Sequence, residues 1–227
     1  MFWKLKYINA VKYIEKGEKE KSYGYFQKML KEKKCDISAV ATYGYQLLKL
    51  GDFESAKNVF SMIDKNKIND KNELAVNMNL GLFYWLTGEK DKAIKLTEET
   101  LEKYKTTNLY INLGYFLALD NQLEKALAVC LEGREFSPDN KAILDNLGFT
   151  YFKMGELEKA EEIYGELFKG AAPSFPECYY NFGLVKKAKG EKGEAKELFE
   201  DALKQQFSPL ISLKETDVLK ELELCRE

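Results

Sequence analysis

Hydrophobic and polar positions along this chain repeat with the period of an α-helix. The apolar residues Leu144, Leu147 and Tyr151 recur at spacings of four and three, as in a helix that buries one face. Gly148 lies on the same face, although a glycine inside a helix costs about 0.5–1 kcal/mol relative to alanine. Close packing against another element must therefore compensate for this glycine.

The pattern around Gly148 occurs six times along the chain. In each copy a small residue occupies the same position, and the successive separations are 34, 37, 33, 34 and 35 residues. These small residues are Ala10, Gly44, Gly81, Gly114, Gly148 and Gly183. A period of this length is typical of an array in which each repeat is one supersecondary unit.

Each copy also carries a turn signal seven residues after the small residue. The turn positions are Gly17, Gly51, Gly88, Asn121, Gly155 and Gly190. Glycine and asparagine adopt the left-handed conformation that ends a helix, and the acidic residue or glutamine that follows suits the start of the next helix. A second small residue lies five positions further on, at Ser22, Ala56, Ala93, Ala126, Ala160 and Ala195. Each copy is therefore predicted to be two helices joined by a tight turn, whose small residues let the axes approach closely.

Together these positions resemble the signature of the tetratricopeptide repeat. The fifth copy matches that signature at Leu144, Leu147, Gly148, Tyr151, Gly155, Ala160, Tyr164 and Pro173. Other copies depart from it locally: Leu117 and Cys130 stand where aromatic residues are usual, and Lys186 departs in the sixth copy. The first copy has Ala10 and Ser22 in place of the usual glycine and alanine, as a degenerate terminal repeat does.

The resemblance implies an all-α fold, a right-handed superhelical α-solenoid of about six helix-turn-helix repeats that form one solenoid domain. The repeats are expected at residues 3–36, 37–73, 74–106, 107–140, 141–175 and 176–209. The polar stretch DKNKINDKN at 64–72 predicts a long loop in the second repeat.

Residues 210–227 are expected to form a C-terminal capping helix. Ser212 and Glu215 resemble a capping box at its start. An apolar stripe along it would cover the last apolar face of the array, and consists of Val218, Leu219, Leu222 and Cys225. The alternative is that this segment is a tail that binds a partner.

The side of each first helix that lies opposite its core face is rich in apolar residues, whereas a helix packed on one side only would be polar there. In proteins similar to this one, the first helices line the concave groove of a superhelix, where peptides bind. The resemblance therefore makes Trp85, Phe149, Phe152 and Tyr180 candidates for peptide binding. The alternative is packing against the next repeat, which is the favoured expectation for Phe149, whereas groove exposure is favoured for the other three.

An asparagine lies two residues before the anchor glycine in four consecutive repeats. These residues are Asn79, Asn112, Asn146 and Asn181. A carboxamide both donates and accepts, so a column of them could hold the backbone of an extended peptide, and some members of the family use such a ladder. Four such bonds would contribute about 2–6 kcal/mol, less than the ~8 kcal/mol of micromolar binding. The alternative is that these side chains bond locally or to water.

Charge and the first residues narrow the possible partners. The formal net charge is −2, from 35 basic and 37 acidic residues, and only Arg134 and Arg226 are arginine, so nucleic-acid binding is not expected. Lysines interrupt the apolar residues of MFWKLKYINAVKYIEKG, which argues against a signal peptide or a membrane span. A cytoplasmic location is therefore expected.

The residue types of the chain give little indication of a catalytic site or a metal site. The chain has no histidine, and its four cysteines form no CxxC pair. We therefore expect no enzyme activity, no metal site and no cofactor. The lysine, asparagine and arginine clamp that some members of the family use for a peptide carboxylate also looks absent, because the equivalent groove positions include Ala142 and Asp145 and no arginine.

The resulting hypothesis is a non-catalytic scaffold that binds a peptide segment of a partner protein in its concave groove. One alternative is a regulator that senses signalling peptides, as some bacterial proteins with this repeat do. Another is a self-assembly module, because Phe2, Trp3 and Tyr7 begin the array without a polar cap and could pair in a homodimer.

Overall fold

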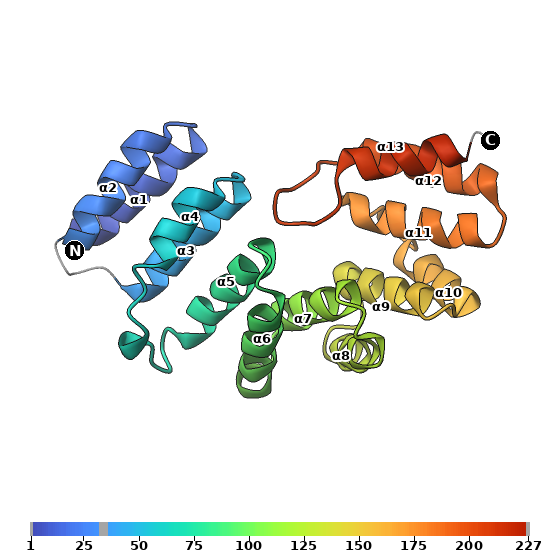
Figure 1. Ribbon diagram of the computed structural model, residues 1–227, viewed down its shortest axis with the longest axis horizontal. Coiled ribbons are helices and arrows are strands. Elements are labelled where there is room, and N and C mark those ends of the chain that lie inside the picture. The colour runs from blue at the N-terminus through green and yellow to red at the C-terminus, as the bar shows by residue number, and fades with distance from the viewer. Residues whose placement is uncertain (1, 32–35, 226–227) are drawn as a thin grey trace. The chain divides into compact units, whose positions relative to one another are not determined.

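The computed structural model describes residues 2–31 and 36–225, and this part of the chain is all-α (Figure 1). The predicted fold class is confirmed. The helices follow one another as α1 (Phe2–Glu15), α2 (Lys19–Lys31), α3 (Ile37–Lys49), α4 (Phe53–Phe60), α5 (Glu73–Leu86), α6 (Lys90–Tyr104), α7 (Thr107–Leu119), α8 (Leu123–Phe136), α9 (Lys141–Lys153), α10 (Leu157–Leu167), α11 (Pro176–Ala188), α12 (Lys192–Leu203) and α13 (Glu215–Leu224). The loop predicted between α4 and α5 contains a short 3₁₀ turn, Lys65–Lys67.

Contacts gather these helices into two compact units, Met1–Glu89 (unit 1) and Lys90–Glu227 (unit 2). In unit 1, α1 packs on α2, and α3 packs on both α4 and α5. In unit 2, consecutive pairs are α7 with α8, α9 with α10, and α11 with α12, and α13 packs on α12. The sequence predicted one continuous domain, and the boundary between the units falls inside the expected third repeat, 74–106.

The turn inside each helix pair has the predicted left-handed residue. The φ angles are 75° at Gly17, 70° at Gly51, 86° at Gly88, 64° at Asn121, 81° at Gly155 and 82° at Gly190. In the fifth pair Gly155 donates its N–H to Phe152 O (2.9 Å) and Glu156 donates to Tyr151 O (3.0 Å). This is the Schellman arrangement, which satisfies carbonyl groups at the end of a helix. It is the reason that a glycine or asparagine recurs at this position.

The anchor glycines make room for a side chain sixteen residues later. A Cβ atom on Gly148 would lie 2.8 Å from the ring of Tyr164, and one on Gly183 would lie 2.5 Å from the ring of Phe199. In the fourth pair the Sγ of Cys130 occupies this place, 2.8 Å from such an atom on Gly114. The sequence attributed the compensation to two matching small residues, whereas the structure places a bulky side chain of the second helix over the glycine.

The C-terminal helix α13 covers α12, as predicted, but differs from the prediction in two details. Val218 and Leu222 are buried, whereas Leu219 is 47% exposed and lies outside the apolar stripe. The capping box at Ser212 and Glu215 was wrong: the helix begins after Lys214, whose N–H donates to Asp217 Oδ2 (2.9 Å). Ser212 is not the cap because its backbone is drawn to α7, as described below.

Candidate functional site

A buried polar cluster joins the fifth and sixth helix pairs. Asp145 of α9 accepts hydrogen bonds from the hydroxyl of Tyr164 (3.0 Å) and from Nδ2 of Asn181 (3.1 Å). Burial raises the pKa of Asp145 to about 6, although the bonds from Asn181 and Tyr164 act in the opposite direction. The cluster links α9, α10 and α11 and fixes the positions of neighbouring side chains on α9 and α11.

The asparagine column therefore has an internal role at two of its four positions. Asn146 is buried and donates from Nδ2 to the backbone O of Ile111 in α7 (2.8 Å), and Asn181 bonds to Asp145. Asn79 and Asn112 are half-buried. For Asn146 and Asn181 the structure thus shows the local bonding that was the alternative to a peptide ladder, and peptide binding by the column stays a prediction.

The predicted aromatic residues are not all placed alike. Trp85 is buried, at 6% exposure, so the expectation of groove exposure was wrong for this residue. Its helix α5 is apolar on nearly every side, and a helix of that kind has no outward face that the sequence could identify. Phe149, Phe152 and Tyr180 are half-buried on α9 and α11.

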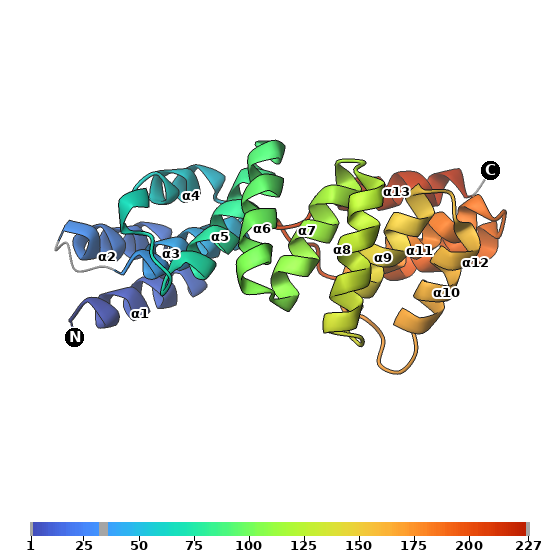
Figure 2. The same cartoon turned by 90° about the horizontal axis from the view of Figure 1, so that it is seen from below.

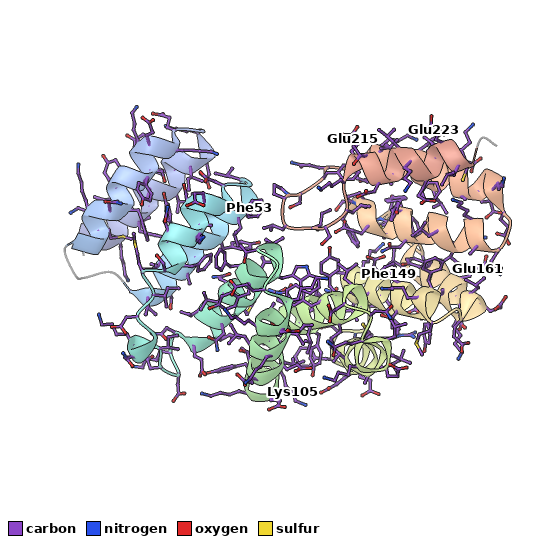
Figure 3. The ribbon with its side chains drawn as sticks, viewed as in Figure 1. Phe53, Lys105, Phe149, Glu161, Glu215 and Glu223 are labelled. Carbon is purple, nitrogen blue, oxygen red and sulfur yellow. The ribbon has the colours of Figure 1, made fainter. Side chains whose placement is uncertain are left out.

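Phe149 and Phe152 pack on each other, whereas Tyr180 packs on the Phe199 ring of α12, with centroids 5.8 Å apart. The rings of Phe149 and Phe152 stack with centroids 6.4 Å apart, and Nζ of Lys153 lies 5.8 Å from the Phe149 ring. Phe149 lies where α9 faces α11 in Figure 3, whereas Lys105 lies on the other side of unit 2, near α6. We call the side of α7, α9 and α11 that carries Tyr115, Phe149, Phe152, Glu177 and Tyr180 the inner face.

Glu177 gives the inner face an unusual electrostatic feature. Its Oε2 atom is buried and has no hydrogen-bond partner among the described residues. Burial raises the pKa of Glu177 to about 7, and the nearby charge of Asp145 raises it further. A buried acceptor without a donor is costly, and groups of this kind cluster at functional sites.

Tyr115 was not among the site residues predicted from the sequence. Its hydroxyl accepts a hydrogen bond from the backbone N–H of Ser212, 2.8 Å away and 97 residues later in the chain. Burial raises the pKa of Tyr115, and the charges of Glu177 and Asp145 also raise it, so these carboxyl groups lie near the hydroxyl. The apolar ridge of the first helices included Tyr115, but no local pattern could reveal its distant partner.

A hollow of about 580 Å³, the outer hollow, is lined by residues of α6, α7 and α8. Its lining includes Leu117, one of the residues that stand where the tetratricopeptide signature has an aromatic, so the smaller side chain leaves space. Ion pairs join the two sides of the hollow, Lys125 with Glu98 (3.5 Å) and Lys105 with Glu132 (2.9 Å). This hollow contains none of the predicted site residues.

Two other kinds of feature, a metal site and a membrane-spanning helix, are absent from the described part of the chain. Within residues 2–31 and 36–225, histidine, cysteine, aspartate and glutamate side chains form no group of three that could hold a metal ion. In the same part of the chain, no helix is long and apolar enough to cross a membrane.

Sequence profiles for known families match the last two helix pairs. Two profiles, both described as tetratricopeptide repeat, match residues 142–170 and 176–208. Among curated proteins, BBSome complex member BBS4 of Bos taurus is 32% identical over 119 residues, which cover 52% of this chain and 22% of that protein. The chain thus spans about a fifth of the length of this relative.

Solved structures extend the similarity to the rest of the fold. PilW, described as a widely conserved type IV pilus biogenesis factor, matches with a TM-score of 0.76 and 16% identity, covering 100% of this chain and 99% of that one. YrrB, described as a TPR protein with an unusual peptide-binding site, matches with a TM-score of 0.56 and 19% identity, covering 89% of this chain and 98% of that one. At such identities the similarity shows the fold alone.

Proposed function

The chain is a tetratricopeptide repeat protein, and we propose that it is a non-catalytic scaffold that binds an extended segment of a partner protein on the inner face of unit 2. Proteins of this family generally act as scaffolds for protein partners. Peptide binding has a precedent on this fold, because YrrB is described as having a peptide-binding site. A cytoplasmic location stays a prediction from composition.

The unsatisfied carboxyl group of Glu177 is the observation that carries the proposal. A partner that donates a hydrogen bond to Oε2 would remove the cost of this buried acceptor. Because Asp145 and Glu177 both contribute negative charge near Tyr115, a lysine or arginine of the partner suits this place best. The expected ligand is therefore an extended segment with a basic residue.

The half-buried rings supply the apolar part of the proposed contact. Phe149, Phe152 and Tyr180 present half-buried aromatic surface on α9 and α11, the helices that carry Asp145 and Glu177, and aromatic side chains dominate binding energy in most interfaces. Asn112 is the member of the asparagine column in unit 2 that we propose for backbone contact. Asn146 and Asn181 hold the helices that carry the site.

The test is selection of peptides from a random phage-displayed library on the full chain. Replacing Phe152 and Tyr180 together by alanine should weaken the selected peptides by about tenfold or more, because interface aromatics often contribute above 1–2 kcal/mol. Leu131→Ala, at an exposed position on α8, is the control and should leave affinity unchanged. Equal affinity in the double variant and the control would contradict binding at the inner face, provided that circular dichroism shows both to be folded.

An exposed apolar pair on α1 supports self-association as a second proposal. Leu5 is 58% exposed and Ile8 is 46% exposed, and residues three apart lie on one face of a helix. Self-association through this face would bury both side chains. A monomer in analytical ultracentrifugation at high concentration would exclude it, and a dimer that Leu5→Lys dissociates would support it.

A further inference from the structure

The segment between α12 and α13 crosses the inner face. We call residues 204–214 the strap. The strap leaves the end of α12, reaches toward α7 and returns to α13 (Figure 1). In the view from below it passes behind α7, on the side away from α6 and α8 (Figure 2). The strap and the outer hollow therefore lie on opposite sides of α7.

The strap is longer than the connection requires. Its eleven residues join helices that pack on each other, whereas the other connections between pairs in unit 2 have two residues (α6 to α7), four (α8 to α9) and eight (α10 to α11). Loops that exceed the length needed for a connection often have a function of their own. The extra length carries the backbone of Ser212 to the hydroxyl of Tyr115.

The contact between Ser212 and Tyr115 has the form of a peptide-binding contact. It joins a backbone N–H of a segment without helix or strand to a side chain of a first helix, and the side chain of Ser212 also bonds to the Tyr115 hydroxyl. Phe207 and Leu213, on either side of Ser212, pack partly buried against the core of unit 2. Between Phe207 and Leu213 the backbone turns, with Ile211 N–H donating to Ser208 O (3.3 Å), so the strap shares with the proposed ligand its backbone donor and flanking apolar side chains.

The strap leaves one acceptor of the inner face unused. Ser212 satisfies Tyr115, but Oε2 of Glu177 has no partner among the described residues, so a partner that reaches both groups would gain a bond that the strap does not make. A partner segment that bonds to both Tyr115 and Glu177 therefore makes one hydrogen bond more than the strap does. This difference in binding free energy is what displacement of the strap requires.

We infer that the strap is an internal occupant of the inner face, held in the place of an extended partner segment, and that binding of the partner displaces Ser212 from Tyr115. This inference rests on the proposed function. It adds that the free protein is self-blocked and that a segment resembling Phe207–Leu213 can bind the same surface.

A synthetic peptide with the sequence of residues 205–214, QQFSPLISLK, is the probe. In a full-chain variant with residues 208–212 replaced by Gly-Ser-Gly-Ser-Gly, fluorescence anisotropy should show at least about tenfold tighter binding of the labelled peptide than in the original protein. The strap is part of the same chain, so it competes with the added peptide at an effective concentration in the millimolar range. The strap-replaced variant lacks this competition. Phe207 and Leu213 stay in place in this variant, so the packing of α13 is retained.

Two further variants test the hydrogen bond itself. Tyr115→Phe, added to the strap-replaced variant, should weaken the peptide by about two- to tenfold, as expected for one lost hydrogen bond. Ser212→Pro removes both the N–H and the hydroxyl of residue 212 and should tighten peptide binding to the chain with its strap otherwise retained. Equal peptide affinity in the original, strap-replaced and Ser212→Pro proteins, all folded, would overturn the strap as an occupant.

The outcomes separate this inference from the proposed function. Library peptides that bind the original and strap-replaced proteins equally, and lose affinity on replacement of Phe152 and Tyr180, would refute the strap and uphold the inner face. If replacement of Phe152 and Tyr180 leaves the affinity of the library peptides unchanged in both proteins, binding at the inner face is refuted. The strap inference is then refuted as well.

Discussion

Asn146 shows that the position of a residue can be predicted from the sequence while its hydrogen-bond partner cannot. The sequence placed it on the first helix beside Gly148 as a candidate for peptide binding. In the structure its side chain is buried, and Nδ2 bonds to Ile111 O in the preceding repeat. The repetition of asparagine is visible in the sequence, but the partner of each amide depends on how neighbouring repeats pack.

Asn146→Ala should therefore destabilise the protein. It removes the hydrogen bond that joins α9 to α7, while the Ile111 carbonyl keeps its bond within the helix, so the expected loss in the free energy of unfolding is about 0.5–1.5 kcal/mol. Asn112→Ala, at the same repeat position but half-buried, is the matched control, with an expected change below about 0.5 kcal/mol. Chemical denaturation measures both, and equal losses would contradict a structural role specific to Asn146.

Glu177 should make the protein less stable as pH rises. The pKa of this carboxyl group in the folded protein is about 7, raised by burial and by Asp145, against 4.5 as its ordinary value. The folded state therefore binds a proton that the unfolded state has released, and stability falls between about pH 4.5 and pH 7.

Glu177→Gln should raise the free energy of unfolding by about 1–3 kcal/mol at pH 8 and change it little at pH 4.5. Glu223→Gln, at an exposed position on α13 (Figure 3), is the control and should have no effect at either pH. Thermal unfolding at the two pH values measures the difference. If Glu177→Gln raises the free energy of unfolding equally at pH 4.5 and pH 8, the buried charge of Glu177 is not the cause of the increase.

At the scale of elements, the helices and turns could be predicted because their signals are local. The glycine and asparagine residues at the turns need no distant partner to adopt positive φ, and all six do so. The strap could not be predicted, because Ser212 and Tyr115 are 97 residues apart. Burial of Trp85 also escaped prediction, since α5 lacks a polar side from which an orientation could be inferred.

Where a ring lies over the anchor glycine, as Phe199 lies over Gly183, the two residues should behave as a coupled unit. Gly183→Ala places a Cβ atom 2.5 Å from the Phe199 ring and should cost about 1–3 kcal/mol, despite the better helix propensity of alanine. In a Phe199→Leu background the same change should cost less, because the smaller side chain can yield. A double-mutant cycle by chemical denaturation measures the coupling, and additive losses would refute direct contact as the cause.

Lys186 joins two helix pairs through ion pairs. Its Nζ atom lies 2.6 Å from Glu161 of α10, 2.6 Å from Glu191 and 2.8 Å from Glu194 of α12. Burial would lower the pKa of Lys186, but the hydrogen bonds to these three carboxylates raise it above its usual range. This network explains why a lysine can stand at a position where the sixth copy departs from the signature.

Lys186→Met should lower the free energy of unfolding by about 1–3 kcal/mol at pH 7, because three carboxylates lose a common partner. The hydrogen bonds from Lys186 and Lys189 lower the pKa of Glu161, so stability from this pair is present above pH 4.5 and is lost as pH falls through the lowered pKa. The difference between the original and Lys186→Met proteins should therefore shrink in acid. A difference that persists at pH 2–3 would assign the loss to packing instead.

At the scale of the whole molecule, repeated pairs of helices provide a framework and unit 2 provides the candidate site. The family similarity rests on the last two pairs, and these same pairs contain Phe149, Phe152, Glu177 and Tyr180. BBS4 matches over about a fifth of its own length, so the scaffold role proposed here is argued from the inner face of this chain. The proposed binding surface follows from the repeat pattern, whereas the proposed self-blocked state rests on the contact between Ser212 and Tyr115, which no local pattern shows.

Hydrogen–deuterium exchange of the full chain, with and without a library-selected peptide, tests binding at the inner face most directly. Partner binding there predicts slower exchange in α7, α9 and α11 on addition of peptide, together with faster exchange in the strap, residues 204–214. Slower exchange confined to α6 and α8, or to residues 2–31 and 36–89, would contradict it.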